Sequence, residues 1–358
     1  MNTAYAAYVK RFLILLSLAV LLYLFSLNSN WVEQYYSEGF YRISSVVQRF
    51  ITGLIPSPIG DFLYVLLVFY ICRSIYIFFR RLKNKKLQKK DRIIVPLQGM
   101  SFVLLLYVLF KILWGLNYSR VPIARQLGIS NEKYDVAELV KLGKFFILKT
   151  NALQDIHRDD FDLRDLRHQA KFAYDKLAAK QAFFTYRSPS VKPVLNSWMV
   201  TKLGTEGYYN PLSGEANVNM RLPAIILPFV TCHEIAHQLG VAREDEANLV
   251  GYLVAINSDN ATFRYSAAYE MLKSILYEIR VKSPEDFEML SKQINPRTLQ
   301  DFKTDKQFWE AYSGNTSAYF GAIFDRFLKL NDQAKGTDSY QDIVIWLYNI
   351  HKKELAGL

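Results

Sequence analysis

Long apolar stretches fill the first third of the chain, whereas the remainder mixes apolar and polar positions as a water-exposed domain does. Three stretches, at about residues 8–28, 59–79 and 95–116, each hold enough apolar residues to cross a bilayer as a helix. The charges of Arg73 and Lys111 lie near the ends of their stretches, where long side chains reach the headgroups. No small-residue cleavage site closely follows the first stretch, so we expect it to remain as an anchor. The pattern therefore predicts a membrane region with three transmembrane helices.

Basic residues predict how this membrane region, residues 1–116, is oriented. The loop at 80–92 holds eight basic residues and one acid, and Lys10 and Arg11 precede the first predicted span. Positively charged loops stay in the cytoplasm, so three spans leave residues 117–358 on the extracytoplasmic side. Much of the formal net charge of +11 is then a topology signal. We expect no nucleic-acid partner, because the basic run is wedged between spans.

Beyond residue 116, apolar residues recur at the three- and four-residue spacing of amphipathic helices. One segment, residues 189–219, changes character, and within it residues 214–219 alternate as a short strand does. Residues 28–60 join the first two spans and are rich in aromatic side chains, which predicts either an amphipathic helix on the membrane surface or a segment packed on the domain. The predicted fold is mainly α with a small β element. Its helices are expected at residues 134–153, 162–182, 227–239, 243–256, 261–281, 284–294, 305–330 and 339–353.

One run of the chain carries the candidate chemistry. His233 and His237 stand one turn apart on a predicted helix, so their imidazoles share a face and can bind one zinc ion. Glu234 follows the first histidine and leans toward the open side of that ion, where a general base is needed. Gly240 supplies the C-terminal stop of the helix. The spacing predicts the HExxH site of a zinc hydrolase.

A catalytic zinc site needs a third protein ligand and leaves its fourth position to water. Arg243 stands where an HExxHxxGxxH enzyme has its third histidine, so the sequence excludes that class. Glu244 and Glu246 are the next candidates, on the helix predicted at 243–256. Glu244 shares a helix face with small or short residues that allow a close approach to the zinc helix, whereas Glu246 points away. We therefore prefer Glu244 and keep Glu246 as the alternative ligand. The small or short residues are Ala247, Asn248 and Gly251.

The motif His233-Glu-x-x-His237 followed by Glu244-x-x-Ala-Asn248 resembles the gluzincins, the zinc peptidases with a glutamate ligand. This resemblance implies a zincin-like metallopeptidase domain in which His233, His237 and Glu244 hold Zn²⁺. It also implies that Glu234 is the catalytic base and that Asn248 orients a ligand histidine. The whole chain resembles an uncharacterised bacterial family of three-span membrane proteins with an HExxH segment. It is therefore expected to be a multi-pass protein of the bacterial inner membrane, with its N-terminus inside and its catalytic domain extracytoplasmic.

Zinc peptidases commonly place an exposed edge strand just before the HExxH helix, and the substrate backbone adds to it as a further strand. Residues 208–219 are the candidate segment, with Glu215, Ala216 and Asn217 as the substrate-binding strand. An exposed structural hairpin is the alternative interpretation of the same pattern. The expected partners are then a protein or peptide substrate and the lipid bilayer.

The predicted reaction is hydrolysis of peptide bonds in an extracytoplasmic substrate. The competing class is a non-catalytic membrane sensor or assembly protein, in which zinc or a His–Glu cluster only joins two helices. Glu234 favours catalysis, because a structural zinc site has no need of a carboxylate there and tends to fill its fourth position with protein.

The remaining reactive residues give weaker indications. A donor to the oxyanion is expected, and Tyr208, Tyr209 and Tyr252 stay open among 24 tyrosines. Cys72 lies in a predicted span and Cys232 beside the motif, so we expect no disulfide between them. Three further histidines are expected to be ordinary surface or core residues: His157, His168 and His351.

Overall fold

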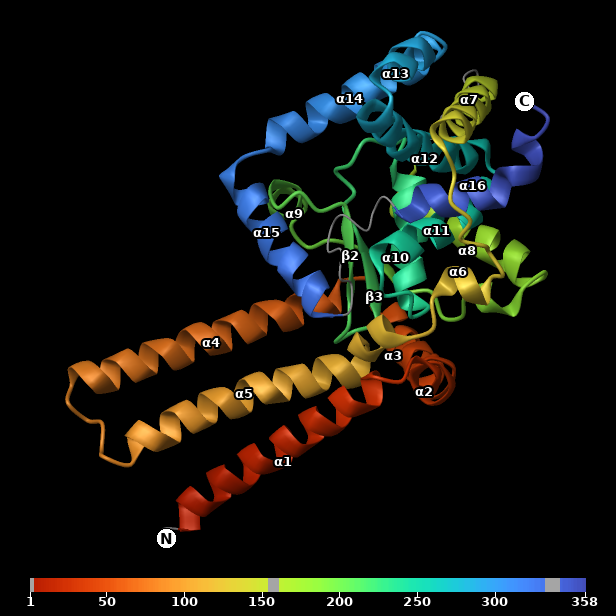
Figure 1. Cartoon of the computed structure of the whole chain (residues 1–358). Helices are drawn as coiled ribbons and strands as arrows, with labels where there is room; N and C mark the ends of the chain where they lie inside the picture. Colours follow the sequence, from red (N-terminus) through yellow and green to blue (C-terminus); the bar gives the residue numbers. More distant parts are fainter. Residues whose placement is uncertain (1–2, 154–160, 332–341) are drawn as a thin grey trace.

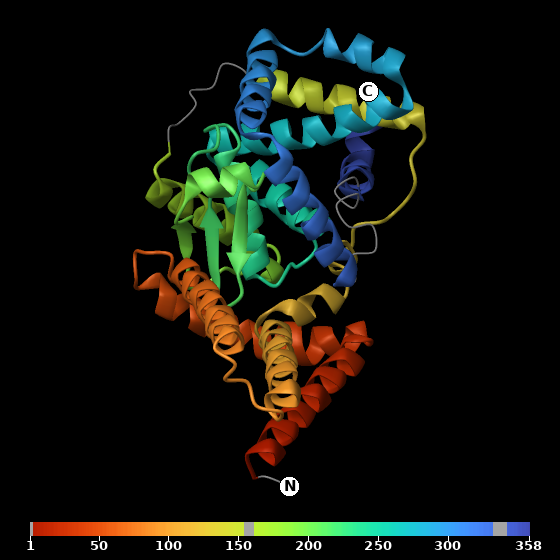
Figure 2. The same ribbon diagram turned by 90° about the vertical axis from the view of Figure 1, so that its left-hand side faces the viewer.

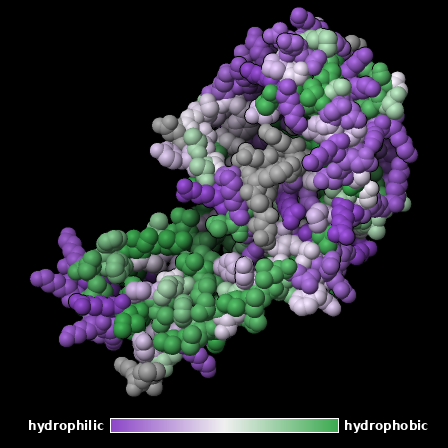
Figure 3. All heavy atoms as spheres, viewed as in Figure 1, coloured by the Kyte–Doolittle hydropathy of each residue, from purple (hydrophilic) through white to green (hydrophobic). Residues whose placement is uncertain are grey.

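Three long apolar helices project from one side of the molecule (Figure 1). They are α1 (Thr3–Ser26), α4 (Ile59–Lys83) and α5 (Asp91–Leu113), and each is long and apolar enough to cross a membrane. The computed structural model describes residues 3–153, 161–331 and 342–358. Figure 3 shows the three helices as a hydrophobic surface beside a largely hydrophilic domain. The three predicted spans are thus confirmed as long apolar helices.

The segment between α1 and α4 is helical and packs on the domain. It comprises α2 (Ser29–Trp31), the π-helix η1 (Val32–Tyr41) and α3 (Arg42–Gly53). The hydroxyl groups of Thr52 in α3 and Ser190 in the domain form a hydrogen bond of 2.9 Å. Contacts of this kind cross the predicted boundary at residue 116, so the division into two domains stays a prediction.

A bundle of helices forms the core beyond the third span. Helix α12 (Ala261–Lys282) lies at its centre and buries Phe263, Tyr265 and Tyr269 completely. The apolar side chains of α12 contact the neighbouring helices at the spacing that the sequence predicts. The other helices of this region are η2 (Gly115–Ser119), α6 (Ile123–Gln126), α7 (Val136–Ala152), α8 (Leu163–Ala178), η3 (Ala182–Phe184), α9 (Ser197–Lys202), α10 (Leu227–Gln238), α11 (Glu244–Ile256), α13 (Pro284–Ser291) and α16 (Asp342–Leu355).

The C-terminal region departs from the predicted helices in one place. We expected a single helix at 305–330, but the structure has α14 (Pro296–Tyr312) and α15 (Asn315–Leu330). The chain breaks at Gly314, whose amide donates to the Ser317 hydroxyl and so starts a new helix. The single-helix prediction was wrong because the apolar spacing continues across Gly314, although the helix itself ends there and a second helix begins.

Three short strands form a sheet in the order β1-β3-β2. Strand β1 (Val191–Pro193) runs parallel to β3 (Glu215–Val218), and β2 (Gly207–Asn210) runs antiparallel to it. Ala216 and Val218 of β3 are buried in the helical core. The opposite side of the sheet meets the domain end of α4, where the Glu215 carboxylate accepts hydrogen bonds from the amides of Ile59 and Gly60 at 3.1 and 2.7 Å.

The predicted position of the substrate-binding edge strand is wrong. Glu215, Ala216 and Asn217 lie in the central strand β3, and β1 and β2 pair with its two sides. Their backbone groups are therefore taken by neighbouring strands, and the Glu215 side chain holds α4 instead of a substrate. Alternation along a sequence predicts a strand but leaves its neighbours open, because packing decides the order of strands. The two edge strands are β1 and β2, and β2, whose Gly207 and Tyr208 are partly exposed, pairs with no further strand in the described part of the chain.

Candidate metal centre

Helix α10 carries the histidine pair through the interior, and every one of its residues is buried. Pro228 occupies the first turn, where its missing amide hydrogen leaves no bond unmade. Gly240 follows the end of the helix with φ of +81°, a left-handed conformation that favours glycine. A β-carbon at Gly240 would also meet the Tyr41 ring at 2.9 Å. The sequence thus starts and stops the helix on either side of the motif.

Three side chains from α10 and α11 converge on one point. The Nε2 atoms of His233 and His237 lie 3.1 Å apart. The Oε2 atom of Glu244 lies 3.3 Å from the first of these and 3.7 Å from the second. In the part of the chain that the structure describes, these residues form the one group of His, Cys, Asp and Glu side chains with the spacing of a metal site. The group could hold a metal ion.

The donor spacing fits zinc. Donors that bind one zinc ion tetrahedrally at about 2.1 Å lie about 3.4 Å from one another. The observed separations of 3.1, 3.3 and 3.7 Å fall on either side of that value. Two imidazole nitrogens and one carboxylate oxygen are also a donor set that zinc accepts. The residues present therefore fit the cofactor that the sequence predicts.

The second nitrogen of each imidazole has its own partner. The Nδ1 atom of His233 lies 2.8 Å from Oδ1 of Asn248, and Nδ1 of His237 lies 2.6 Å from the carbonyl oxygen of Val241. An acceptor at Nδ1 fixes the tautomer in which Nε2 carries the free lone pair, which is the form that binds a metal. Asn248 thus lies where the resemblance to gluzincins places it.

Small residues on α11 let it cross α10 closely. A β-carbon on Gly251 would stand 3.2 Å from the backbone nitrogen of His233 and 3.3 Å from its Cα atom. Ala247, one turn earlier, is completely buried. The helix face that the sequence singled out is therefore the contact face, and it brings Glu244 to the histidines.

Glu246 lies away from this group and has a different partner. Its Oε1 atom accepts a hydrogen bond of 2.7 Å from the backbone amide of Ile123 at the start of α6. Burial raises the pKa of the Glu246 carboxyl. The structure thus brings together the preferred ligand Glu244, and not the alternative Glu246, with His233 and His237.

Glu234 lies beside the three donors without belonging to them. It is almost completely buried, and its Oε2 atom has no hydrogen-bond partner among the described residues. A β-carbon on Gly207 of strand β2 would stand 2.6 Å from Glu234 Oε1. Burial raises the pKa of the Glu234 carboxyl to about 8, and the carboxylate of Glu244 contributes to that rise. Strand β2 therefore passes close to a buried carboxyl group whose pKa is raised.

The three donors shift one another's pKa values. Burial alone would lower the pKa of His237, but the Glu244 carboxylate raises it to about 9. Burial would raise the pKa of Glu244, yet His237 and His233 hold it well below its usual range. Burial lowers the pKa of His233. A cation at this point would take over the role that the proton of His237 plays beside Glu244.

Aromatic side chains from the membrane region bind the last carbonyl groups of α10. Trp114 directly follows α5, and its indole Nε1 donates to the His237 carbonyl at 3.1 Å. The Tyr41 hydroxyl donates to the carbonyl of Gln238 at 3.1 Å. The rings of Trp114 and His237 also lie 5.9 Å apart, edge to face. The domain end of the third span thus supports a candidate ligand histidine.

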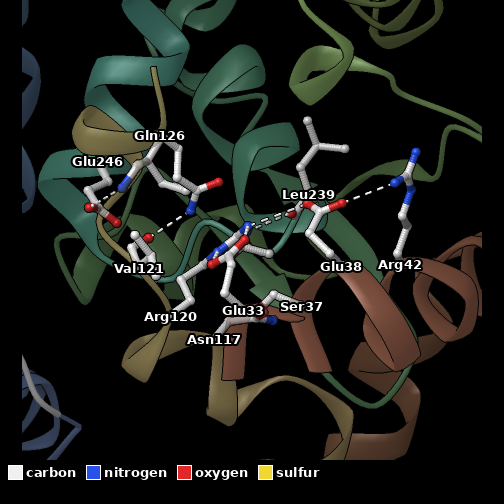
Figure 4. A network of polar contacts seen from close by, with 12 residues as sticks. Glu33, Ser37, Glu38, Arg42, Asn117, Arg120, Val121, Gln126, Leu239 and Glu246 are labelled. Atoms are coloured by element: carbon white, nitrogen blue, oxygen red, sulfur yellow. Dashed lines mark hydrogen bonds and ion pairs between the residues drawn. The ribbon is translucent and has the colours of Figure 1, made fainter. Parts of the chain in front are cut away.

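Two buried arginines also donate hydrogen bonds to carbonyl groups at the C-terminal end of α10. Arg49 of α3 donates to the Gln238 carbonyl at 2.6 Å. Arg120 donates to the Gly240 carbonyl at 3.1 Å and forms an ion pair of 2.5 Å with Glu33 of η1. Figure 4 shows Arg120 between Glu33 and the chain at Leu239. Positive charge at a helix C-terminus is stabilising, because the unpaired carbonyl groups there are partly negative. Arg49 and Glu33 of the membrane region therefore help to hold the end of the helix that carries the two candidate ligand histidines.

Other candidate residues take structural positions. Cys232 is buried and Cys72 is exposed on α4, and both are free, as expected. The Tyr252 hydroxyl bonds to His351 at 2.6 Å, away from the metal group. Tyr208 donates to Asp61 of α4 at 2.5 Å. His157 lies outside the described residues.

Several residues that shape the site were not among those predicted from the sequence. Gly207 and the helix-capping residues Arg49 and Arg120 come from segments far from the motif, and no local pattern marks them. Glu206 was also missed, although it precedes β2 directly. Burial and the neighbouring carboxyl of Glu270 raise its pKa. A partly buried carboxyl next to strand β2 is thus part of the surroundings of Glu234.

The fold and this site together define a mainly helical membrane protein with three spans and a candidate metal centre. The chain belongs to the family described as "Protein of unknown function (DUF3810)", whose model matches residues 36–348. The matched region includes two of the three spans, the sheet and all residues of the metal group. No curated protein and no solved structure matches the chain.

Proposed function

We propose that the protein is a membrane-anchored, zinc-dependent metallopeptidase with a zincin-like domain. One observation carries this proposal: three donors with the spacing of a zinc site lie beside a second carboxyl group, that of Glu234, which is not one of them. A protein that only binds zinc has no need of that buried carboxyl, whose placement costs free energy. An enzyme needs such a group within reach of a water molecule at the metal.

The metal would be held by His233, His237 and Glu244. When bound, zinc supplies a Lewis acid that activates water and polarises a scissile carbonyl group. In its ionised form, the Glu234 carboxylate would accept a proton from water and deliver it to the departing amine. Asn248 and the Val241 carbonyl keep the two imidazoles in the orientation that leaves Nε2 free.

The exposed edge of β2 is the proposed position for the substrate backbone. An extended peptide adds to a free strand edge through main-chain hydrogen bonds. Gly207 of β2 contacts Glu234, so a peptide on this edge lies over the metal group. This assignment replaces Glu215, Ala216 and Asn217, whose strand has no free side.

The competing function is a structural zinc site in a sensor or assembly protein. Structural sites usually take four protein ligands. The described residues offer three donors at this point, which leaves one position for water or substrate. The arrangement therefore favours an enzyme.

The test replaces Glu234 with glutamine, which keeps the shape of the side chain and removes the base. Membranes that contain wild type or Glu234→Gln are incubated with the cellular proteome, and new peptide termini are mapped by mass spectrometry. We expect Glu234→Gln to retain zinc and to lose cleavage by about a hundredfold or more, the contribution of general-base catalysis. Identical termini from both proteins would refute the peptidase and favour the structural zinc site.

A further inference from the structure

Helix α3 packs on the domain with its polar face and exposes its apolar face, which is the reverse of the usual arrangement. Its polar residues Arg49 and Thr52 are buried, whereas Val47, Phe50 and Leu54 at its exposed side and end are apolar. Leu54 is 71% exposed. A helix in water turns its apolar face to the core. The α3 segment joins two membrane spans, so the bilayer surface is the apolar medium at this place.

A second exposed apolar group lies beside the domain end of α4. The backbone amide of Leu195 donates to Asp61 in the first turn of α4 at 2.7 Å. Leu195 and its neighbours Trp198 and Met199 in α9 are each about half exposed. Tryptophan is enriched where protein meets the headgroup layer. This exposed apolar group therefore adjoins the domain end of α4.

Helix α15 is apolar on two faces. One face packs through Leu328 and Phe324 against the cluster that contains Trp114 at the end of α5. The other face exposes Tyr319, Ile323 and Leu330, with Leu330 84% exposed. In Figure 2, α15 (blue) crosses the face of the domain that is turned toward the viewer, beside the strands. The exposed face has no protein cover in the described part of the chain.

Single side chains connect the surroundings of the metal group to two of the spans, α5 and α4. Trp114 at the end of α5 contacts His237 directly. Tyr208 follows Gly207 on the exposed strand and bonds to Asp61 of α4. The strand over Glu234 is therefore held at the level where the spans leave the membrane.

We infer that the exposed apolar side chains of α3, α9 and α15, which we call the interfacial surface, rest on the lipid bilayer, and that the metal centre cleaves polypeptide held at that membrane surface. The substrate class is then the flanks of other membrane-inserted segments and not free soluble proteins. This inference rests on the proposed peptidase function. The continuity of the interfacial surface with three spans identifies lipid as its occupant, because no other apolar medium adjoins all three helices.

The first experiment tests lipid contact without any need for activity. Single cysteines replace Phe50, Ile323 and, as a control on the distant helix α13, Met289 in full-length protein with Cys72→Ser. Each is labelled with an environment-sensitive fluorophore in liposomes of phosphatidylethanolamine and phosphatidylglycerol. We expect doxyl-labelled lipid to quench the labels at 50 and 323 and to leave the label at 289 unchanged. Equal responses at all three positions would overturn the inference. A blue shift without quenching at 50 and 323 would also overturn it, since protein would then cover the surface.

The second experiment uses the positions of Glu234-dependent termini. We expect them within about 15 residues of a membrane-spanning segment on the side of the domain, because each extended residue reaches at most about 3.5 Å. The variant Ile323→Asp should lower these cleavages about tenfold by weakening surface contact, whereas Met289→Asp should not. Glu234-dependent termini spread through soluble proteins would overturn this inference and leave the peptidase standing. An absence of such termini would remove both.

Discussion

Gly207 of strand β2 lies so close to Glu234 of helix α10 that a β-carbon on the glycine would stand 2.6 Å from the carboxylate oxygen Oε1. The same carbon would lie 2.8 Å from the backbone oxygen of Asn217 in the neighbouring strand. Strand β2 and the proposed base Glu234 therefore lie so close together that no side chain fits between them at Gly207. Only glycine lets the strand pass at this distance.

Gly207→Ala should consequently impair the site. The added methyl group must displace Glu234 or the strand, and small displacements of catalytic groups cost about a hundredfold in rate. We expect that loss in the terminus-mapping assay with zinc content unchanged. Gly321→Ala is the matched control, because a β-carbon there meets nothing within 4 Å. Full activity of Gly207→Ala would mean that Glu234 has more room than the structure gives it.

The convergence of the three candidate ligands was predictable because it depends on local geometry. His233 and His237 repeat at one helical turn, and the small face of α11 brings Glu244 to them. Three spans were predictable for a similar reason, since length and apolar content decide them. The positions of Glu215 and Asn217 were not, because sheet order depends on contacts between separated segments.

The helix-terminus contacts could not be predicted from the sequence at all. Arg49 meets Gln238 across 189 residues of chain, and Trp114 meets His237 across 123. A buried arginine gives no signal in a sequence, because arginines are mostly exposed. Tertiary packing of the membrane region decides these pairs.

Replacing each of the two glutamates of α11 in turn by glutamine distinguishes the preferred ligand from its alternative. Glu244→Gln should lower zinc content strongly, because a neutral amide is a poor zinc ligand. Glu246→Gln should keep its zinc, since Glu246 bonds to the amide of Ile123 and not to the metal group. Elemental analysis of the purified proteins measures both, with His233→Ala as the metal-poor reference. Equal zinc in the two glutamine variants would contradict the assignment of Glu244.

Removal of the charge at Arg49 tests how the membrane region holds α10. Arg49 donates to the carbonyls of Gln238 and Arg187 at 2.6 and 3.2 Å, and its side chain is buried. Arg49→Gln loses these charge-assisted bonds, so we expect the melting temperature in detergent to fall by about 3–6 °C. The control Arg42→Gln breaks only an exposed pair with Glu38 and should change it little. Equal melting temperatures for the two variants would show that Arg49 does not stabilise the helix end.

His351 should make the domain sensitive to acid. Its ring lies 4.8 Å from the ring of Phe145, its Nε2 atom is 2.6 Å from the Tyr252 hydroxyl, and its Nδ1 atom is 3.2 Å from Glu354. Burial lowers the pKa of His351 from its usual 6.5, with the nearby Lys149 ammonium acting in the same direction. Below about pH 6.5 the histidine binds a proton in the unfolded chain but stays neutral in the folded protein. The free energy of unfolding therefore falls as the pH falls.

The measurement compares thermal unfolding from pH 7.5 to 5.5. One such proton changes the free energy of unfolding by up to about 1.4 kcal/mol per pH unit. His351→Gln keeps a partner for Tyr252 and cannot titrate, so its melting temperature should fall less than that of wild type. His168→Gln, at an exposed position, should follow wild type. A parallel decline of all three proteins would assign the acid sensitivity to other groups.

The side of the membrane on which the domain lies is the prediction with the widest consequence. Eight basic residues and one acid in the loop at 80–92 should keep that loop in the cytoplasm, so an odd number of spans carries the domain across. Alkaline phosphatase fused after Leu358 should be active, because this enzyme folds only outside the cytoplasm, and a fluorescent protein at the same site should be dark. Fusions after Lys86 should give the reverse pair of signals and serve as the internal control. A fluorescent, phosphatase-inactive fusion at Leu358 would place the metal centre and its substrates in the cytoplasm, while the donor geometry and the contact of the interfacial surface with lipid would stand unchanged.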